Sequence, residues 1–268
     1  MNTVGLISKP QASVTDDTVG CVVRENSLAR LSLVIPCRNE LESIPQLRSR
    51  IGELVEAVVD QGIDFDLIFV DDGSTDNTAD SLEQQFSDMP QTVVIQHPTN
   101  RGITAAVMTG MRAAQTEWVV VLDADCTYDP LQVLNLLPSL VDDEYDLVLG
   151  SPYHPSGKVL NVPRWRLWIS SIASQIYRRL LKTKVYCYTG CFRAYRRSAF
   201  DDIKLQHSGF VGMTELVWQS ERAGNRIKEI PATLDVRRYG QSKLRLLSVI
   251  RTHLQFMMKI FTSRLIGR

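Results

Sequence analysis

Short apolar runs alternate along the chain with longer segments in which apolar residues recur every three or four positions. A short continuous apolar run that ends in polar or glycine residues predicts a strand buried on both faces. Such runs occupy residues 31–35, 66–70, 93–95, 118–122 and 146–150. Apolar residues at helical spacing predict a helix over residues 41–60, and the capping residues at 75–78 predict a helix through about Phe86. A further helix is expected over 102–114. This alternation predicts an α/β fold with a parallel sheet covered by helices on both faces.

Polar residues directly follow three of these strands. The first strand leads into residues 36–40 (P-C-R-N-E), the second into 71–74 (D-D-G-S) and the fourth into 123–125 (D-A-D). Parallel α/β sheets bind their ligands at the carboxyl ends of the strands. We therefore expect the three loops to meet at one edge of the sheet and to form the functional site there.

Asp123 and Asp125 are separated by one residue at the end of the fourth strand. Two carboxylates that close repel each other and favour a bound cation, for which Mg²⁺ or Mn²⁺ is the natural choice. The alternative is a solvated turn, in which aspartate is also common. The strand-end position favours the metal site. The D-D-G-S segment is compatible with an ordinary turn, or with a contact from Asp72 to a ribose or base.

Other site chemistries find little support. The sequence contains neither G-x-G-x-x-G nor G-x-x-x-x-G-K-[ST], so dinucleotide and Walker-type phosphate loops are not indicated. The four histidines, His97, His154, His207 and His253, are scattered, and we expect surface or loop positions for them rather than catalytic ones. Five cysteines without a C-x-x-C pair indicate a reducing compartment, with neither structural disulfides nor a zinc site.

Charge is distributed unevenly, although the net charge is zero. Residues 1–150 contain 8 Lys and Arg against 24 Asp and Glu, and residues 151–268 contain 22 against 6. The acidic first half would repel phosphates, so nucleic-acid binding is not expected. Residues 1–28 are polar and aperiodic, which predicts a flexible leader. The asymmetry suggests different tasks for 29–150 and 151–243.

Two basic segments, 164–184 and 244–268, have apolar residues at helical spacing. Basic amphipathic helices with Trp and Phe lie readily on an anionic membrane surface. Packing of the apolar stripes against the sheet is the alternative. No apolar stretch reaches the roughly 20 residues that a bilayer requires, and the N-terminus lacks the apolar core typical of a signal peptide. We therefore expect a cytoplasmic protein, peripheral on the cytoplasmic face of a membrane, with 244–268 as a basic amphipathic C-terminal helix.

The ordered motifs resemble glycosyltransferase family 2, the inverting enzymes with a GT-A fold, and within it the branch that glycosylates polyprenyl or dolichyl phosphate. The resemblance runs from Leu31 to about Leu244 and implies one GT-A domain over 29–243. Its motifs are V-I-P-C-R-N-E (34–40), V-D-D-G-S-T-D-N-T (70–78), N-R-G (100–102), D-A-D (123–125), G-S-P-Y (150–153), Y-T-G-C-F-R (188–193), G-F-x-x-x-T-E (209–215) and R-R-Y-G-Q-S-K (237–243).

The resemblance implies roles for individual residues. The nucleoside of a sugar-nucleotide donor would be held by Pro36, Arg38, Glu40, Val70 and Asp72, with Asp71 supporting the loop. Asp123 and Asp125 would bind Mg²⁺ or Mn²⁺ on the donor pyrophosphate, with Ala124 in the same pocket. Arg166, Arg237 and Lys243 would bind phosphate groups of the acceptor or donor. Arg38 and Pro152 stand where the mannosyltransferase branch has an aromatic residue and an arginine, respectively.

The function that the resemblance implies is metal-dependent inverting transfer of a hexose to a polyprenyl phosphate, from a donor of the GDP-mannose or UDP-glucose type. An acceptor phosphate is already ionised and needs no general base. The first alternative is transfer to a hydroxyl of a glycan, lipid or small molecule, with Glu215 as the catalytic base. The second is a non-catalytic nucleotide-sugar-binding partner of a membrane protein.

Overall fold

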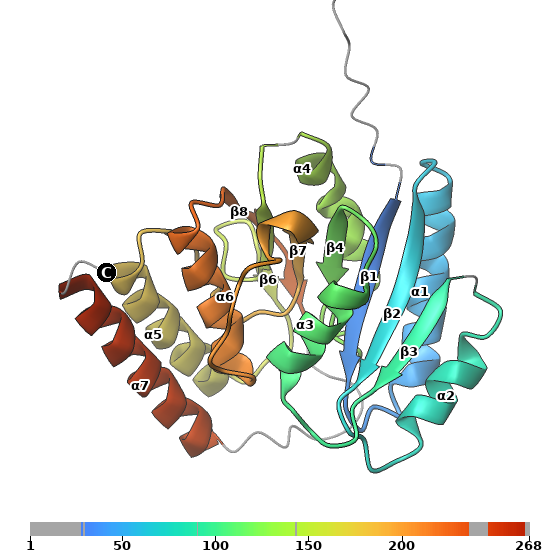
Figure 1. Cartoon of the computed structure of the whole chain (residues 1–268), viewed down its shortest axis with the longest axis horizontal. Helices are drawn as coiled ribbons and strands as arrows, with labels where there is room; N and C mark the ends of the chain where they lie inside the picture. The colour runs from blue at the N-terminus through green and yellow to red at the C-terminus, as the bar shows by residue number, and fades with distance from the viewer. Residues whose placement is uncertain (1–27, 29, 90, 143, 236–245, 266–268) are drawn as a thin grey trace, which may run out of the picture.

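A computed structural model of the chain describes residues 28, 30–89, 91–142, 144–235 and 246–265. A seven-stranded sheet runs through the centre, with helices in front of it and behind it (Figure 1). The strands lie in the order β3-β2-β1-β4-β7-β5-β8. Their bounds are β1 (Arg30–Cys37), β2 (Asp64–Asp71), β3 (Thr92–Gln96), β4 (Trp118–Val121), β5 (Leu147–Ser151), β7 (Arg193–Arg196) and β8 (Ile227–Pro231). β6 (Lys158–Val159) pairs with β9 (Thr233–Leu234) as a separate ribbon.

The sheet is parallel except at one strand. β7 runs antiparallel between β4 and β5, and every other pairing in the seven-stranded sheet is parallel. The expected α/β architecture with a mainly parallel sheet is confirmed, and the five predicted strands are β1 to β5.

Helices cover both faces, as predicted. Two apolar clusters lie on opposite sides of the sheet. The first receives side chains from α1 (Ile44–Val59), α2 (Thr78–Gln85), the 3₁₀ helix Pro130–Asn135 and α4 (Leu137–Val141). The second receives side chains from α3 (Ile103–Ala113), α5 (Arg164–Leu180), α6 (Phe210–Arg222) and α7 (Leu246–Leu265). A further 3₁₀ turn occupies Arg197–Ala199.

Close packing between α3 and the sheet depends on Gly110. A Cβ atom at this position would lie 2.3 Å from Cγ1 of Val34 on β1. Only glycine therefore allows α3 to approach β1 this closely. The same helix starts after Gly102, whose φ of +96° lies in the region that favours glycine.

Helices α5 and α7 lie side by side at one end of the molecule (Figure 1). Some apolar side chains of these two helices pack in the core, and others are exposed at the surface. Tyr177, Phe256 and Ile260 are buried in the second apolar cluster, whereas Trp168 on α5 and Leu265 on α7 are 72% and 71% exposed. None of the helices in the described part of the chain is long and apolar enough to cross a membrane.

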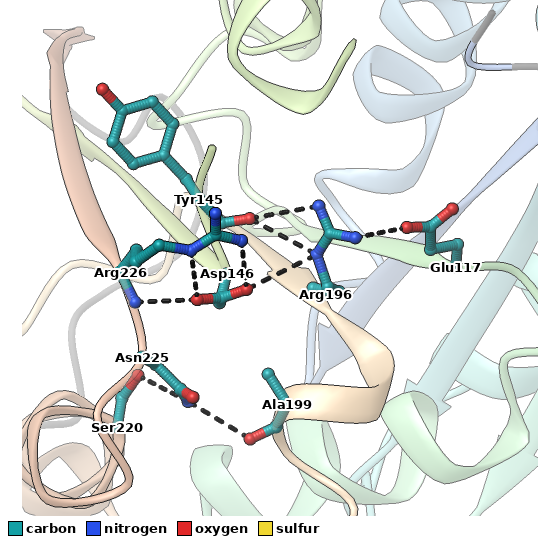
Figure 2. Close-up of polar contacts among 8 residues, drawn as sticks. All are labelled: Glu117, Tyr145, Asp146, Arg196, Ala199, Ser220, Asn225 and Arg226. Atoms are coloured by element: carbon teal, nitrogen blue, oxygen red, sulfur yellow. Dashed lines mark hydrogen bonds and ion pairs between the residues drawn. The ribbon is translucent and has the colours of Figure 1, made fainter. Parts of the chain in front are cut away.

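A charged network stabilises the sheet at the starts of β5 and β8 (Figure 2). Asp146 accepts hydrogen bonds from the backbone N–H of Arg226 at 2.8 Å and from its Nη2 at 3.0 Å. Arg196 lies 3.6 Å from Asp146 and donates to Glu117 at 2.6 Å. The bonds from Arg226 lower the pKa of the Asp146 carboxyl. The network lies at the edge opposite the carboxyl ends of the parallel strands.

Candidate active site at the carboxyl edge of the sheet

The three polar strand ends meet at one edge of the sheet, as expected. In the register of β1 and β2, Cys37 lies opposite Asp71, and the N–H of Asp72 donates to the carbonyl of Cys37 at 2.9 Å. In the register of β1 and β4, Val34 lies opposite Val121. The loops at 36–40, 71–74 and 123–125 therefore leave neighbouring strands on the same side.

Asp71 and Asn39 tie the first two loops together. Asp71 Oδ1 accepts hydrogen bonds from the N–H of Ser74 at 3.2 Å and from its hydroxyl. Ser74 Oγ accepts from the N–H of Asn39 at 2.9 Å, and Asn39 Oδ1 accepts from the N–H of Thr75 at 2.7 Å. The carboxylate of Asp71 therefore holds the turn after β2.

The other residues expected around the nucleoside differ in exposure. Arg38 is exposed, Pro36 and Glu40 are half-buried, and Val70 is fully buried in the second apolar cluster. The carboxylate of Glu40 accepts a hydrogen bond from Ser43 Oγ at 3.0 Å. The backbone N–H of Glu40 donates to Thr78 Oγ1 at 2.9 Å. Burial of the Val70 side chain leaves its backbone as the part that a ligand could meet.

Asp72 is buried and accepts three hydrogen bonds. The N–H of Arg101 donates to Oδ1 at 2.8 Å, and the N–H of Gly102 donates to Oδ2 at 2.7 Å. His97 Nδ1 lies 2.8 Å from Oδ1, and His97 Nε2 lies 3.0 Å from Thr109 Oγ1. His97 is only 6% exposed, so it lies in a loop but not at the surface. Sequence reasoning missed this contact, because spacing along the chain does not join positions 72 and 97.

Two other histidines make contacts that the sequence did not indicate, although His207 lies in a loop, as expected. His253, expected at the surface or in a loop, is buried on α7, because α5 covers it and the Tyr177 hydroxyl lies 2.8 Å from its Nδ1. His207 Nδ1 lies 2.9 Å from Oε2 of Glu215. Neither contact could be found without the packing of α5, α6 and α7.

Asp123 and Asp125 are half-buried at the end of β4, and Ala124 between them is buried. Asp125 Oδ1 accepts from the N–H of Thr127 at 3.0 Å and from the Thr127 hydroxyl, which fixes the carboxylate. The described residues contain no cluster of three or more His, Cys, Asp or Glu that could enclose a metal. A pair of carboxylates fits Mg²⁺, which keeps several waters and takes its remaining ligands from phosphates. The donor set therefore fits a divalent ion shared with a diphosphate.

A cavity of about 190 Å³ opens beside Asp123. Its walls come from the ends of β4 and β5, from α5, from the 187–191 loop and from the start of α6, and they include Tyr128, Tyr153, Ser170, Thr189, Cys191 and Phe210. Burial raises the pKa of the Cys187 and Cys191 thiols and of the Tyr128 hydroxyl. These groups stay protonated at neutral pH, so they can donate hydrogen bonds but are poor nucleophiles.

The side chains of Glu229, which is half-buried, and of Arg193, which is buried, hold the 187–191 loop. The Glu229 carboxylate accepts from the N–H groups of Tyr186 and Cys187 at 2.8 and 2.9 Å. The fully buried guanidinium of Arg193 donates to the carbonyls of Tyr188 and Met213, both at 2.7 Å. No disulfide joins Cys37, Cys126, Cys187 and Cys191, the cysteines that the structure describes.

Glu215 lies inside the protein and does not line the cavity. Its Oε2 accepts hydrogen bonds from the backbone N–H groups of Gln206 and His207, each at 2.9 Å. The Nδ1 atom of the His207 ring also lies 2.9 Å from this oxygen. Its Oε1 lies 3.9 Å from Lys259 Nζ on α7 and has no hydrogen-bond partner among the described residues. The arrangement anchors the loop before α6.

The expected phosphate-binding residues fall largely outside the described positions. Arg237 and Lys243 lie in the segment 236–245, which the structure does not describe. Arg166 belongs to the first turn of α5, and its side chain is not described. Their roles therefore stay predictions.

Known proteins resemble this chain over most of its length. The family model described as glycosyl transferase family 2 matches residues 32–204. The undecaprenyl-phosphate mannosyltransferase of Micrococcus luteus is 32% identical over 221 residues, which cover 80% of this chain and 87% of that protein. The polyprenol monophosphomannose synthase of Mycolicibacterium smegmatis is 31% identical, and the match covers 80% of this chain and 81% of that protein. The dolichol-phosphate mannosyltransferase of Pyrococcus furiosus is 30% identical, and the match covers 81% of this chain but 59% of that protein.

Solved structures share the fold at lower identity. Glucosyl-3-phosphoglycerate synthase from Mycobacterium tuberculosis, in complex with Mn²⁺, UDP and glucosyl-3-phosphoglycerate, superposes with a TM-score of 0.63. It is 20% identical and covers 88% of this chain and 80% of its own. The same enzyme has been solved with Mg²⁺ and UDP, at a TM-score of 0.62. The family match and the relatives above 30% identity together establish that this chain is a glycosyltransferase of family 2 with a GT-A fold.

Proposed function

We propose that the protein transfers one hexose, with inversion, from a nucleotide sugar of the GDP-mannose or UDP-glucose type to a polyprenyl phosphate, with Mg²⁺ or Mn²⁺, at the cytoplasmic face of a membrane. The relatives named as polyprenyl-phosphate mannosyltransferases support this acceptor class. The observation that carries the proposal is the carboxylate pair Asp123 and Asp125 beside a cavity that reaches α5. In this proposal residues 29–150 bind the donor, and 151–243 bind the acceptor.

The reaction would form one bond and break one bond at the anomeric carbon. An oxygen of the acceptor phosphate attacks that carbon from the face opposite the leaving group. The bond to the nucleoside diphosphate breaks, and its electron pair leaves with the diphosphate. A divalent ion held by Asp123 and Asp125 would offset this developing charge. Thr127, which holds Asp125 Oδ1, would keep that carboxylate in place during the reaction.

The bonding of Glu215 supports a phosphate acceptor over a hydroxyl. A hydroxyl acceptor needs a base within hydrogen-bond reach of its proton. Glu215 is fully buried, its Oε2 accepts from Gln206 and His207, and it does not line the cavity beside Asp123. An ionised phosphate would require no such base, so the burial of Glu215 does not obstruct this chemistry.

The outer face of α5 and α7 supports action at a membrane surface. Its exposed apolar side chains are Trp168 and Ile172 on α5, and Leu254, Met258, Phe261 and Leu265 on α7. Arg179, Arg251 and Arg264 are exposed on the same two helices, and neither helix contains an acidic residue. Apolar side chains with a basic surround are suited to an anionic lipid surface. Ser170 of α5 and Asp123 line the same cavity. An acceptor lipid bound along α5 would therefore have its phosphate near Asp123.

A pair of matched acceptors tests the acceptor class. Purified protein is incubated with Mn²⁺, labelled nucleotide sugars and either a polyprenyl phosphate or the same polyprenol without its phosphate. We expect label in the organic phase only with the phosphorylated lipid. Transfer to the free polyprenol at a comparable rate would favour the hydroxyl alternative, with Glu215 as its candidate base.

A further inference from the structure

The loop at residues 97–102 wraps around the carboxylate of Asp72. Gly73 lets the loop approach, because a Cβ atom there would lie 2.5 Å from the carbonyl carbon of Thr99. The N–H groups of Arg101 and Gly102 then donate to the two carboxylate oxygens at 2.8 and 2.7 Å. The backbone of the loop is therefore shaped by one acidic side chain at the end of β2.

His97 adds the bond that fixes the orientation of this carboxylate. A carboxylate only accepts hydrogen bonds, so the Nδ1 of His97, 2.8 Å from Oδ1, is the donor. In the neutral ring Nε2 is then the acceptor, and the Thr109 hydroxyl at 3.0 Å donates to it. The His97 and Asp72 side chains are 4% and 5% exposed. The imidazole therefore links the ends of β2 and β3 to α3.

These bonds leave one acceptor position of the Asp72 carboxylate without a described donor. A carboxylate offers about four acceptor positions. The described donors occupy both positions on Oδ1, through His97 and Arg101, and one position on Oδ2, through Gly102. The remaining position belongs to Oδ2, and its direction is fixed because the carboxylate cannot rotate without breaking three bonds.

We infer that His97, held in place by Thr109, is a positioning residue that orients the Asp72 carboxylate toward the nucleoside of the donor. The inference rests on the proposed function, in which Asp72 contacts that nucleoside. Without His97, Asp72 would still be held by the two backbone N–H groups, but it would lose its only described side-chain bond and the link to α3. Donor binding should weaken, while the acceptor site beyond Asp123 should not change.

The test measures binding of UDP and of GDP, each with Mn²⁺, to the full chain by isothermal titration calorimetry. His97→Phe keeps the ring size and removes both nitrogens, whereas His97→Asn keeps an N–H near the position of Nδ1. A hydrogen bond to a charged group is worth about 1.5–3 kcal/mol, which corresponds to about tenfold or more in affinity. We expect at least that increase in Kd for His97→Phe, and a recovery of most of the affinity in His97→Asn. In the transfer assay the donor KM should rise, and the acceptor KM should stay near that of the wild type.

Two controls separate positioning from general stability. Thr109→Val and Thr109→Ser differ in the hydroxyl that faces Nε2, so only the valine variant should weaken nucleotide binding; this pair decides the question if His97→Phe does not fold. Asp146→Asn breaks the network of Figure 2 at the opposite edge and should leave nucleotide binding unchanged. Wild-type affinity in His97→Phe, or an equal loss in Asp146→Asn, would overturn the inference. A wild-type protein that binds neither nucleotide would overturn the proposed function, and the inference with it.

Discussion

The hydroxyl of Tyr177 on α5 lies 2.8 Å from Nδ1 of His253 on α7, and both side chains are buried. This bond joins the two helices whose outer face is apolar and basic. Phe256, one turn further along α7, packs against Tyr177, His207 and Trp218. A buried histidine therefore takes part in the contacts that attach α7 to the protein.

We expect acid to loosen α7 before it affects the rest of the fold. Burial, with a smaller effect from His207, lowers the pKa of His253 to about 4. An unfolded histidine has a pKa of about 6.5, so above that pH the burial of His253 carries no protonation penalty. As the pH falls from about 6.5 to 4, the unfolded state binds a proton that the folded state excludes, and the fold is progressively destabilised. By pH 4.5 the loss should be about 1–3 kcal/mol.

Thermal unfolding monitored between pH 7.5 and 4.5 tests this expectation. His253→Gln removes the titrating group, so its Tm should start lower but fall less steeply over this range. Parallel Tm curves for the wild type and His253→Gln would contradict the assignment.

Asp125→Asn should reduce transfer by at least about a hundredfold, because it would weaken the binding of the divalent ion whose positive charge would offset that of the leaving diphosphate. Asp123→Asn should have a comparable effect. Nucleoside binding without metal should change little in either variant. The assay is label transfer over a Mn²⁺ series, and Asp129→Asn, which lies in the same loop region but bonds to Arg50, provides a matched control. Equal activity of Asp125→Asn and Asp129→Asn would contradict the prediction that Asp125 binds the metal ion.

Glu215→Gln distinguishes the two acceptor classes. If the acceptor is a phosphate, the variant should keep kcat within about fivefold of the wild type, because no base is removed. Stability should fall by about 1–3 kcal/mol, since Oε2 accepts from two backbone N–H groups. A general base is worth about 10²–10⁴-fold in rate. A loss of that size in kcat with an intact fold, and with the loss of an ionisation in the pH–rate profile, would instead assign Glu215 as the base.

Trp168→Ser and Leu265→Ser should weaken binding to anionic vesicles, because each removes an exposed apolar side chain from the face of α5 and α7. Loss of one such side chain should cost roughly 1–2 kcal/mol of membrane affinity, or about five- to thirtyfold. Sedimentation with phosphatidylglycerol and phosphatidylcholine vesicles measures it.

Val59→Ser provides the control, since Val59 is also exposed but lies on α1. Equal effects of the Val59 and Trp168 substitutions would contradict a specific face, as would equal binding to both lipids. Binding through the basic surround should also weaken as salt increases.

The apolar pattern of the chain predicted most of the fold from β1 to β5. Each continuous run from Leu31 to Gly150 became a strand, because helices on both faces of a parallel sheet bury the side chains on either side of such a run. The edge strand β3 departs from this expectation, since it is only partly buried. The D-A-D and D-D-G-S segments lie at the same edge because β2 and β4 both run parallel to β1.

Two features could not be read from the pattern. The segment Arg193–Arg196 is short and bears two arginines, yet it forms the antiparallel strand β7, since the carbonyls of Tyr188 and Met213 accept from the buried Arg193 guanidinium. The contact of His97 with Asp72 depends on the adjacency of β2 and β3 and on the position of α3. Both arise from contacts between segments that are distant in sequence.

The most direct test of the central proposal is transfer of label from nucleotide sugars to a polyprenyl phosphate, measured in the organic phase for the wild type and Asp125→Asn. We predict metal-dependent label in the lipid from one donor with the wild type, and a loss of at least about a hundredfold with Asp125→Asn. Metal-dependent hydrolysis of the donor without label in the phosphorylated lipid, or equal labelling by both proteins, would contradict the proposal.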